Sequence, residues 1–184
     1  MKKIILASCI LIMGSNTLFA QMYMTRTGKI DFNATSKKSS EKIEAVNNEI
    51  ANVINAKTGD IVFQVLVKSF KFESELMQEH FNENYMESDK YPKSEFKGNI
   101  SNINEVNFSK DGTYNVTVAG KLTIHGVPKD VSVPGTLTVK GKMVNAKAKF
   151  TIVLKDYKVE VPSLVADKVN KEAIITLDSD LTQK

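Results

Sequence analysis

Apolar and polar positions alternate along much of this chain, most clearly over residues 114–124. A period of two places successive side chains on opposite faces of a β-strand. One face of this run carries Tyr114, Val116, Val118, Gly120, Leu122 and Ile124. Similar alternation returns over residues 131–139, 146–154 and 173–177. These runs predict successive antiparallel strands joined by turns and loops.

The chain before residue 70 gives a less regular pattern. Residues 25–34 alternate and predict a first strand. Residues 43–56 fit a helix by their apolar spacing, but they are rich in Asn and β-branched residues, so we favour an irregular strand. A hairpin turn is expected at residues 57–60 and a further strand over residues 61–67. The two phenylalanines that follow fall out of phase, which indicates a bulge or bend there.

A single short amphipathic helix interrupts these strands. One side of it is predicted to carry Leu76, Met77, His80, Phe81 and Tyr85, and the opposite side Glu75, Glu79 and Glu83. Ser74 suits the N-cap, Pro92 stops any continuation, and a strand is expected to begin at Phe96. One helix inserted in an all-β chain suggests a barrel with a lid or plug, and therefore a cavity.

Seven or eight long strands with one apolar face fit either a sandwich or a closed barrel. Strands of about ten residues and the need to protect strand edges favour the barrel. Gly120 and Gly135 fall on inward faces, where they would permit tight coiling or leave room inside. The lysine-bearing outer faces are incompatible with the apolar exterior of a membrane barrel. We therefore predict an all-β fold, an antiparallel β-barrel of about eight strands with one short helix, wide enough for one ligand.

The N-terminal 20 residues have the layout of a signal peptide. Lys2 and Lys3 precede an apolar stretch, and Ala20 offers a small residue at the cleavage point. We expect residues 1–20 to be removed and residues 21–184 to form one barrel domain that is periplasmic or secreted. A lipoprotein signal ending at Cys9 is the alternative, but its apolar stretch would be too short.

Composition narrows the function further. Cys9 is the only cysteine, so the exported domain has no thiol for disulfides, metal binding or nucleophilic catalysis. The formal charge of +4 includes Lys2 and Lys3, which leaves about +2 on the exported domain. That charge is too small to indicate nucleic-acid binding, and no later apolar run could insert stably in a membrane.

Two motifs resemble the YceI-like family of secreted bacterial proteins. The first runs from His80-Phe81-Asn82-Glu83-Asn84-Tyr85-Met86 through Lys90-Tyr91-Pro92 to Phe96. The second is the segment Gly120-Lys121-Leu122-Thr123-Ile124-His125-Gly126-Val127-Pro128-Lys129-Asp130-Val131. The resemblance implies a lipocalin-like barrel that binds polyisoprenoid lipid, with no catalytic residues. The chain departs from the family over residues 35–47, which lack the histidine often found in the first hairpin.

The predicted ligand-binding residues are inward-facing apolar side chains and the inner side of the helix. A flexible polyprenyl chain requires a dry tunnel of branched and aromatic side chains and no directional motif. The same residues would serve as ordinary core in a filled barrel. The candidates are Phe63, Val65, Val67, Met77, His80, Phe81, Tyr85, Val116, Val118, Leu122, Val133, Leu137, Phe150, Ile152 and Leu154.

The histidines give two further hypotheses. His80 is interpreted as a partly buried helix residue, or as a residue that hydrogen-bonds a ligand head group at the barrel mouth. His125 is expected to be exposed in a turn. Neither has the spacing of a metal site with the nearby carboxylates. No serine lies in a nucleophile elbow, so no catalytic residue, metal or cofactor is predicted.

The sequence therefore predicts a binding protein and not an enzyme. Its ligand would be a long apolar lipid, a polyisoprenoid or an isoprenoid quinone, held by a periplasmic carrier or sequestering protein. One alternative is a structural or stress-response module whose barrel is filled. Another is an enzyme acting on such a lipid, which would need a polar triad that we do not find. A mouth-to-mouth homodimer stays open, with no sequence feature in its favour.

Overall fold

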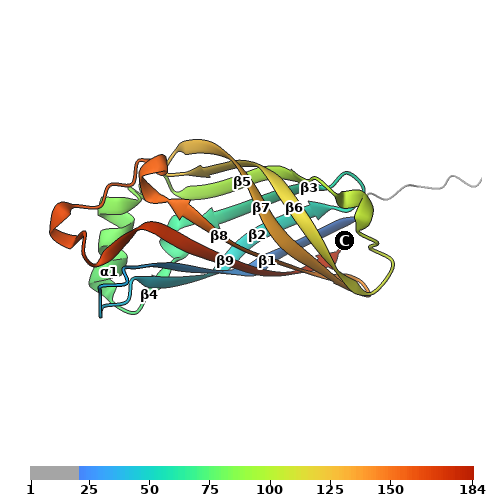
Figure 1. Ribbon diagram of the computed structural model, residues 1–184. Coiled ribbons are helices and arrows are strands. Elements are labelled where there is room, and N and C mark those ends of the chain that lie inside the picture. Colours follow the sequence, from blue (N-terminus) through green and yellow to red (C-terminus); the bar gives the residue numbers. More distant parts are fainter. Residues whose placement is uncertain (1–20) are drawn as a thin grey trace, which may run out of the picture.

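The computed structural model describes residues 21–184, so the predicted signal peptide lies outside the described residues. Within them, eight antiparallel strands close into an elongated barrel, as predicted (Figure 1). The barrel strands are β1 (Met22–Thr35), β2 (Glu44–Asn55), β3 (Asp60–Leu66), β5 (Lys93–Ile100), β6 (Gly112–Ile124), β7 (Val127–Lys140), β8 (Met143–Val153) and β9 (Val169–Gln183). The shorter elements are η1 (Val67–Ser69), β4 (Lys71–Phe72), α1 (Glu75–His80), η2 (Phe81–Tyr85), η3 (Ile103–Glu105), η4 (Leu154–Tyr157) and η5 (Ser163–Val165).

The strands follow the order β1-β9-β8-β7-β6-β5-β3-β2, and pairing of β1 with β2 closes the ring. The ambiguous segment at residues 43–56 is the strand β2, which rules out the helical interpretation. The expected bend after β3 is the 3₁₀ turn η1, which leads β4 back to pair with the start of β2. Helix α1 lies at one end of the barrel, and the C-terminus lies at the opposite end (Figure 1).

The helix is less clearly amphipathic than predicted, although α1 and the π-helical turn η2 together reach Tyr85 as expected. Ser74 caps it as expected, since its hydroxyl accepts a hydrogen bond from the Met77 amide at 3.3 Å. Leu76 is 60% exposed and His80 is also exposed, so the predicted apolar side of the helix was wrong at both positions. Each residue of an α-helix is rotated by about 100° from the one before. Once Met77 and Phe81 face the barrel, the residues just before them turn toward solvent.

Paired glycines let two strands coil tightly against each other. Gly98 and Gly120 are register partners between β5 and β6. A Cβ on Gly120 would collide with the Gly98 Cα and the Lys97 carbonyl oxygen, and it would lie 2.9 Å from the Phe96 ring. Gly120 therefore permits close approach of the strands and creates no free space. Gly135 also permits close approach, since a Cβ there would lie 2.7 Å from the Lys147 carbonyl oxygen, although it borders the interior cavity described below.

The barrel has two halves with different packing. We call the half that holds the C-terminus the far half and the half that holds α1 the helix half. Side chains in the far half are almost completely enclosed: Tyr23, Ile54, Val139, Val144 and Leu181 are each 0–2% exposed. Tyr23 also stacks on Phe108, with ring centroids 5.3 Å apart. The far half is therefore filled by its own side chains.

A buried polar contact crosses β1 between these halves. The Asn52 amide on β2 donates a hydrogen bond to the Ser179 hydroxyl on β9 at 3.3 Å, and both residues are fully buried. Strand β1 lies between β2 and β9, and its register is interrupted on either side of Gly28. A Cβ on Gly28 would lie 2.7 Å from the Ser179 hydroxyl oxygen. The glycine therefore makes room for two polar side chains to meet over the strand.

The pairing between β7 and β8 ends halfway along the barrel. Strand β7 pairs with β6 along its full length, and β8 pairs with β9 along its full length. Between β7 and β8 the ladder runs only from the turn at Lys140 and Met143 to the last rung, Gly135 with Ala148. Beyond that rung, residues 127–134 and 149–153 are not paired with each other. We call this unpaired stretch in the helix half the β7–β8 window.

Candidate functional site

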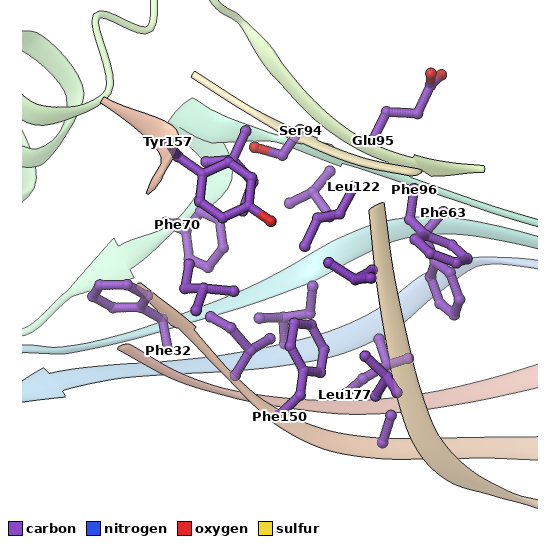
Figure 2. A pocket seen from close by; sticks show the side chains of 18 of the residues that line it. Phe32, Phe63, Phe70, Ser94, Glu95, Phe96, Leu122, Phe150, Tyr157 and Leu177 are labelled. Atoms are coloured by element: carbon purple, nitrogen blue, oxygen red, sulfur yellow. The ribbon is translucent and has the colours of Figure 1, made fainter. Parts of the chain in front are cut away.

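An apolar cavity of about 220 Å³ lies in the helix half and reaches the paired part of β7 and β8 at Leu137 and Ala146 (Figure 2). Its wall is made by inward-facing residues of the barrel strands, by α1 and η2, and by η4. The last rung of the β7–β8 ladder, Gly135 with Ala148, also borders it, as does the rung before it, Thr136 with Lys147. The cavity therefore extends outward as far as the edges of the β7–β8 window.

The cavity brings together most of the residues predicted to bind a ligand. Those that line it are Phe63, Val65, Met77, Phe81, Tyr85, Val116, Val118, Leu122, Val133, Leu137, Phe150, Ile152 and Leu154. They belong to strands far apart in the sequence, and the shared inward face of each strand explains their convergence. Their contact with a ligand stays a prediction.

Two candidates lie elsewhere. Val67 is 1% exposed and packs in the core beside the cavity, because the chain leaves the strand geometry at η1 and turns away from the wall. His80 lies on the solvent side of α1 and does not border the cavity. The hypothesis that His80 reaches a ligand head group is therefore not supported by its position.

An aromatic cluster closes the helix end of the cavity. Phe81 of η2 lies at its centre, with ring centroids 5.7 Å from Phe32, 5.6 Å from Phe70 and 4.9 Å from Phe72. Edge-to-face and tilted aromatic pairs at such distances add stability beyond the area they bury. The ligand candidates did not include Phe32, Phe70 or Phe72, although all three line the cavity. Phe70 and Phe72 reach it only because η1 redirects the chain.

Charged side chains at the cavity edge point away from its interior. Glu95 extends outward in Figure 2, and its carboxylate pairs with Lys97 at 2.6 Å. Lys147 forms an ion pair with Asp178 at 3.0 Å. An unpaired charge in an apolar cavity would be strongly unfavourable, so this arrangement keeps the interior suited to hydrocarbon.

His125 connects three segments at the helix end of the barrel. The His125 Nε2 atom lies 2.7 Å from a Glu87 carboxylate oxygen, and Nδ1 lies 3.2 Å from the Tyr157 carbonyl oxygen. Both neighbours accept hydrogen bonds, so the imidazole satisfies both when it is doubly protonated. The Tyr91 ring packs edge-on against His125 at 4.7 Å. We call Glu87, Tyr91, His125 and Tyr157 the mouth latch.

The mouth latch corrects the expectation that His125 is exposed. Its side chain is only 10% exposed. Glu87 and His125 both adopt positive φ angles, 42° and 50°, which few residues other than glycine do. The latch connects the loop after η2, the β6–β7 turn and η4. The β7–β8 window therefore has the Gly135–Ala148 rung at one end. At its other end is the hydrogen bond between His125 and the Tyr157 carbonyl oxygen.

Among residues 21–184, no group of three or more His, Cys, Asp and Glu side chains is arranged to hold a metal ion. In the same part of the chain, no helix has both the length and the apolar character needed to cross a membrane. The site provides a mostly apolar surface inside the barrel, next to the unpaired edges of β7 and β8.

Comparison with known proteins identifies the family of this domain. The sequence model of the YceI-like domain matches residues 17–180. No curated protein sequence matches the chain.

Several solved structures are similar. A polyisoprenoid binding domain from Saccharophagus degradans implicated in plant cell wall breakdown is 12% identical, with a TM-score of 0.77 over 89% of this chain and 98% of that one. BcnA of Burkholderia cenocepacia is 17% identical, with a TM-score of 0.63 over 84% and 96%. The YCEI protein of Campylobacter jejuni is 15% identical, with a TM-score of 0.58 over 79% and 87%. At these identities the likeness shows a shared fold.

Proposed function

Because the chain belongs to the YceI-like domain family, we propose that its barrel binds a long apolar lipid, a polyisoprenoid or an isoprenoid quinone. The observation that carries this proposal is the apolar cavity of the helix half, with its charged neighbours turned outward. The similar Saccharophagus degradans structure, a polyisoprenoid binding domain, supports the same class of ligand.

The energetics suit a hydrocarbon chain. Each buried CH₂ contributes about 0.8 kcal/mol, so an isoprenoid of about 20 carbons would gain on the order of 15 kcal/mol before the cost of ordering it. The cavity of about 220 Å³ is smaller than the roughly 300–1,000 Å³ of typical ligand pockets. A long chain must therefore widen the cavity, and the unpaired edges of the β7–β8 window are the part of the wall with the fewest hydrogen bonds to break.

We place the protein in the periplasm as a carrier or sequestering protein. The signal-peptide pattern of residues 1–20 supports export. In this role, lipid enters and leaves sideways through the β7–β8 window, and the protein performs no catalysis on it. The far half is closed by its own side chains, so it offers no second route.

Native mass spectrometry of residues 21–184 purified from an exporting bacterial host tests the proposal. We expect a stoichiometric isoprenoid or quinone mass, identified after organic extraction. A variant Val118→Phe fills the cavity from β6 and should lose the lipid. Its matched control is Thr117→Phe, the neighbouring exposed position on the outer face of the same strand, which should keep it.

The alternative of a structural module with a filled barrel gives the opposite result. A folded protein without extractable lipid, which also refuses added polyprenol, would favour that alternative over the carrier.

A further inference from the structure

Besides Tyr85 and Thr136, two more residues with hydroxyl groups line the otherwise apolar cavity, Tyr157 and Ser94. Tyr157 of η4 is 4% exposed, and Figure 2 shows its hydroxyl directed into the cavity. Ser94 lies on β5 opposite Val65 and also lines the cavity. Neither residue was among the candidates from the sequence. They come from segments 63 positions apart, which the closure of the barrel brings to the same cavity.

Neither hydroxyl has a hydrogen-bond partner within residues 21–184. Tyr157 is held through its backbone instead, because its carbonyl oxygen accepts a hydrogen bond from His125 at 3.2 Å. The Tyr114 hydroxyl, by contrast, donates to the Lys110 carbonyl at 3.0 Å. A ligand oxygen inside the cavity would give each of these hydroxyls a hydrogen bond, so the two groups are suited to meet it.

The surroundings of the two hydroxyls determine which kind of ligand oxygen can bind next to them. The charged side chains at this edge, Glu95 and Lys147, are turned outward into ion pairs. Burial raises the pKa of the Tyr157 phenol, and the charge of Asp156 raises it further, so the phenol stays a neutral donor. A phosphate placed here would bring negative charge into an apolar cavity with no cation facing it.

From this arrangement we infer that Tyr157 and Ser94 form a subsite for the uncharged polar end of the lipid, a hydroxyl or carbonyl oxygen. The inference rests on the proposed function and specifies its ligand. A free prenol or a quinone fits the subsite, whereas a prenyl phosphate does not. His125 acts as a positioning residue, because its bond to the Tyr157 backbone fixes where the phenol points.

The test compares three ligands that share one 20-carbon isoprenoid chain: the prenol, the hydrocarbon without the hydroxyl, and the prenyl monophosphate. Affinities are measured by displacement of a fluorescent apolar probe from residues 21–184. We expect the wild-type protein to bind the prenol more tightly than the hydrocarbon, and the monophosphate most weakly. Tight binding of the monophosphate would overturn the inference.

Variants assign the effect to the two hydroxyls. Tyr157→Phe and Ser94→Ala should each weaken prenol binding about three- to tenfold and leave hydrocarbon binding unchanged, as loss of one hydrogen bond predicts. Tyr114→Phe removes a phenol outside the cavity and should change neither affinity. An equal loss for prenol and hydrocarbon, or no loss for prenol, would contradict the subsite. Failure of the wild-type protein to bind any of the three ligands would instead contradict the proposed function.

Discussion

The two halves of this barrel are built from the same strands yet pack differently. In the far half, β7 and β8 are hydrogen-bonded and residues such as Ile54, Val144 and Leu181 have no exposed surface. In the helix half, the same two strands separate beyond Gly135, and wall residues such as Val133 and Phe150 are only partly buried. Alternation therefore decides which side chains face inward, and the pairing of the strands decides whether they fill the space.

Local features explain where the change occurs. Pro134 directly precedes the last β7–β8 rung and has no amide hydrogen to extend a ladder. At the other end of the window, the mouth latch holds η4 against the β6–β7 turn. The aromatic cluster around Phe81 then closes the helix end with rings from β1, β4 and the turn after η1. The helix half is thus covered by η4, the β6–β7 turn and the aromatic cluster, whereas pairing of β7 with β8 closes the far half.

The largest contrast should appear when a large side chain is removed from each half. Leu181→Ala leaves a cavity in the packed far half and should lower the free energy of unfolding by about 2–5 kcal/mol. Ile152→Ala enlarges a cavity that already exists and should cost less. Urea denaturation of both variants measures this, and an equal or larger cost for Ile152→Ala would remove the distinction between the halves.

A methyl group added at the glycine pair should have the next largest effect. Gly120→Ala places a Cβ against the backbone of β5, so we expect a loss of about 1–3 kcal/mol from overpacking. Thermal unfolding of this variant is compared with Ala119→Gly, the opposite change at the adjacent position. A neutral Gly120→Ala would show that the strands do not depend on this close approach.

Closing the β7–β8 window should slow lipid exchange. Continuing the register beyond Gly135 and Ala148 would place Ser132 opposite Thr151, two exposed positions on the edges of the window. With both replaced by cysteine and joined by a short bis-maleimide, we expect exchange of a fluorescent prenol to slow at least tenfold, a barrier change of about 1.4 kcal/mol.

The control for that experiment joins the same strands where they are already paired. Lys140→Cys with Met143→Cys cross-links the ladder next to its turn and should leave exchange unchanged. Residues 21–184 contain no other cysteine to interfere. Equal exchange rates in the cross-linked and free window variants would show that lipid passes elsewhere.

The smallest expected effect is on the pH dependence of stability, through Asp178 on the outer surface of the barrel. Burial opposes ionisation of Asp178, but hydrogen bonds from Asn145 and Lys147 and the charges of Lys147 and Lys29 outweigh it, so its pKa is lowered. A carboxylate with a lowered folded pKa stabilises the fold above its unfolded pKa of about 4, and this contribution is lost as pH falls through the folded pKa. Asp178→Asn should therefore reduce stability slightly at pH 7 and not at pH 2. An equal difference from wild type at both pH values would contradict this.

The sequence predicted most of the fold because the relevant signals are local. Alternation located the strands, turn residues located their ends, and Ser74 marked the start of the helix. The inward faces of those strands also predicted most of the cavity wall. These features need no knowledge of which strands become neighbours.

What the sequence did not predict depends on contacts between distant segments. The end of the β7–β8 ladder is not visible in strands that alternate as regularly as the others. Tyr157 lies in a short 3₁₀ turn without periodicity, and its place in the cavity follows from its contact with His125. The burial of His125 depends on Glu87, which is 38 positions away. His80 was misplaced because helical spacing alone does not show which side of a short helix will face the barrel.

The most direct test of the difference between the two halves is a methyl NMR titration of residues 21–184 with a 20-carbon prenol. Methyl groups of Val118, Val133 and Ile152 in the helix half should shift on binding, whereas those of Ile54, Val144 and Leu181 in the far half should stay in place. Shifts of similar size in both halves, or shifts confined to the outer surface, would contradict a lipid site enclosed in the helix half.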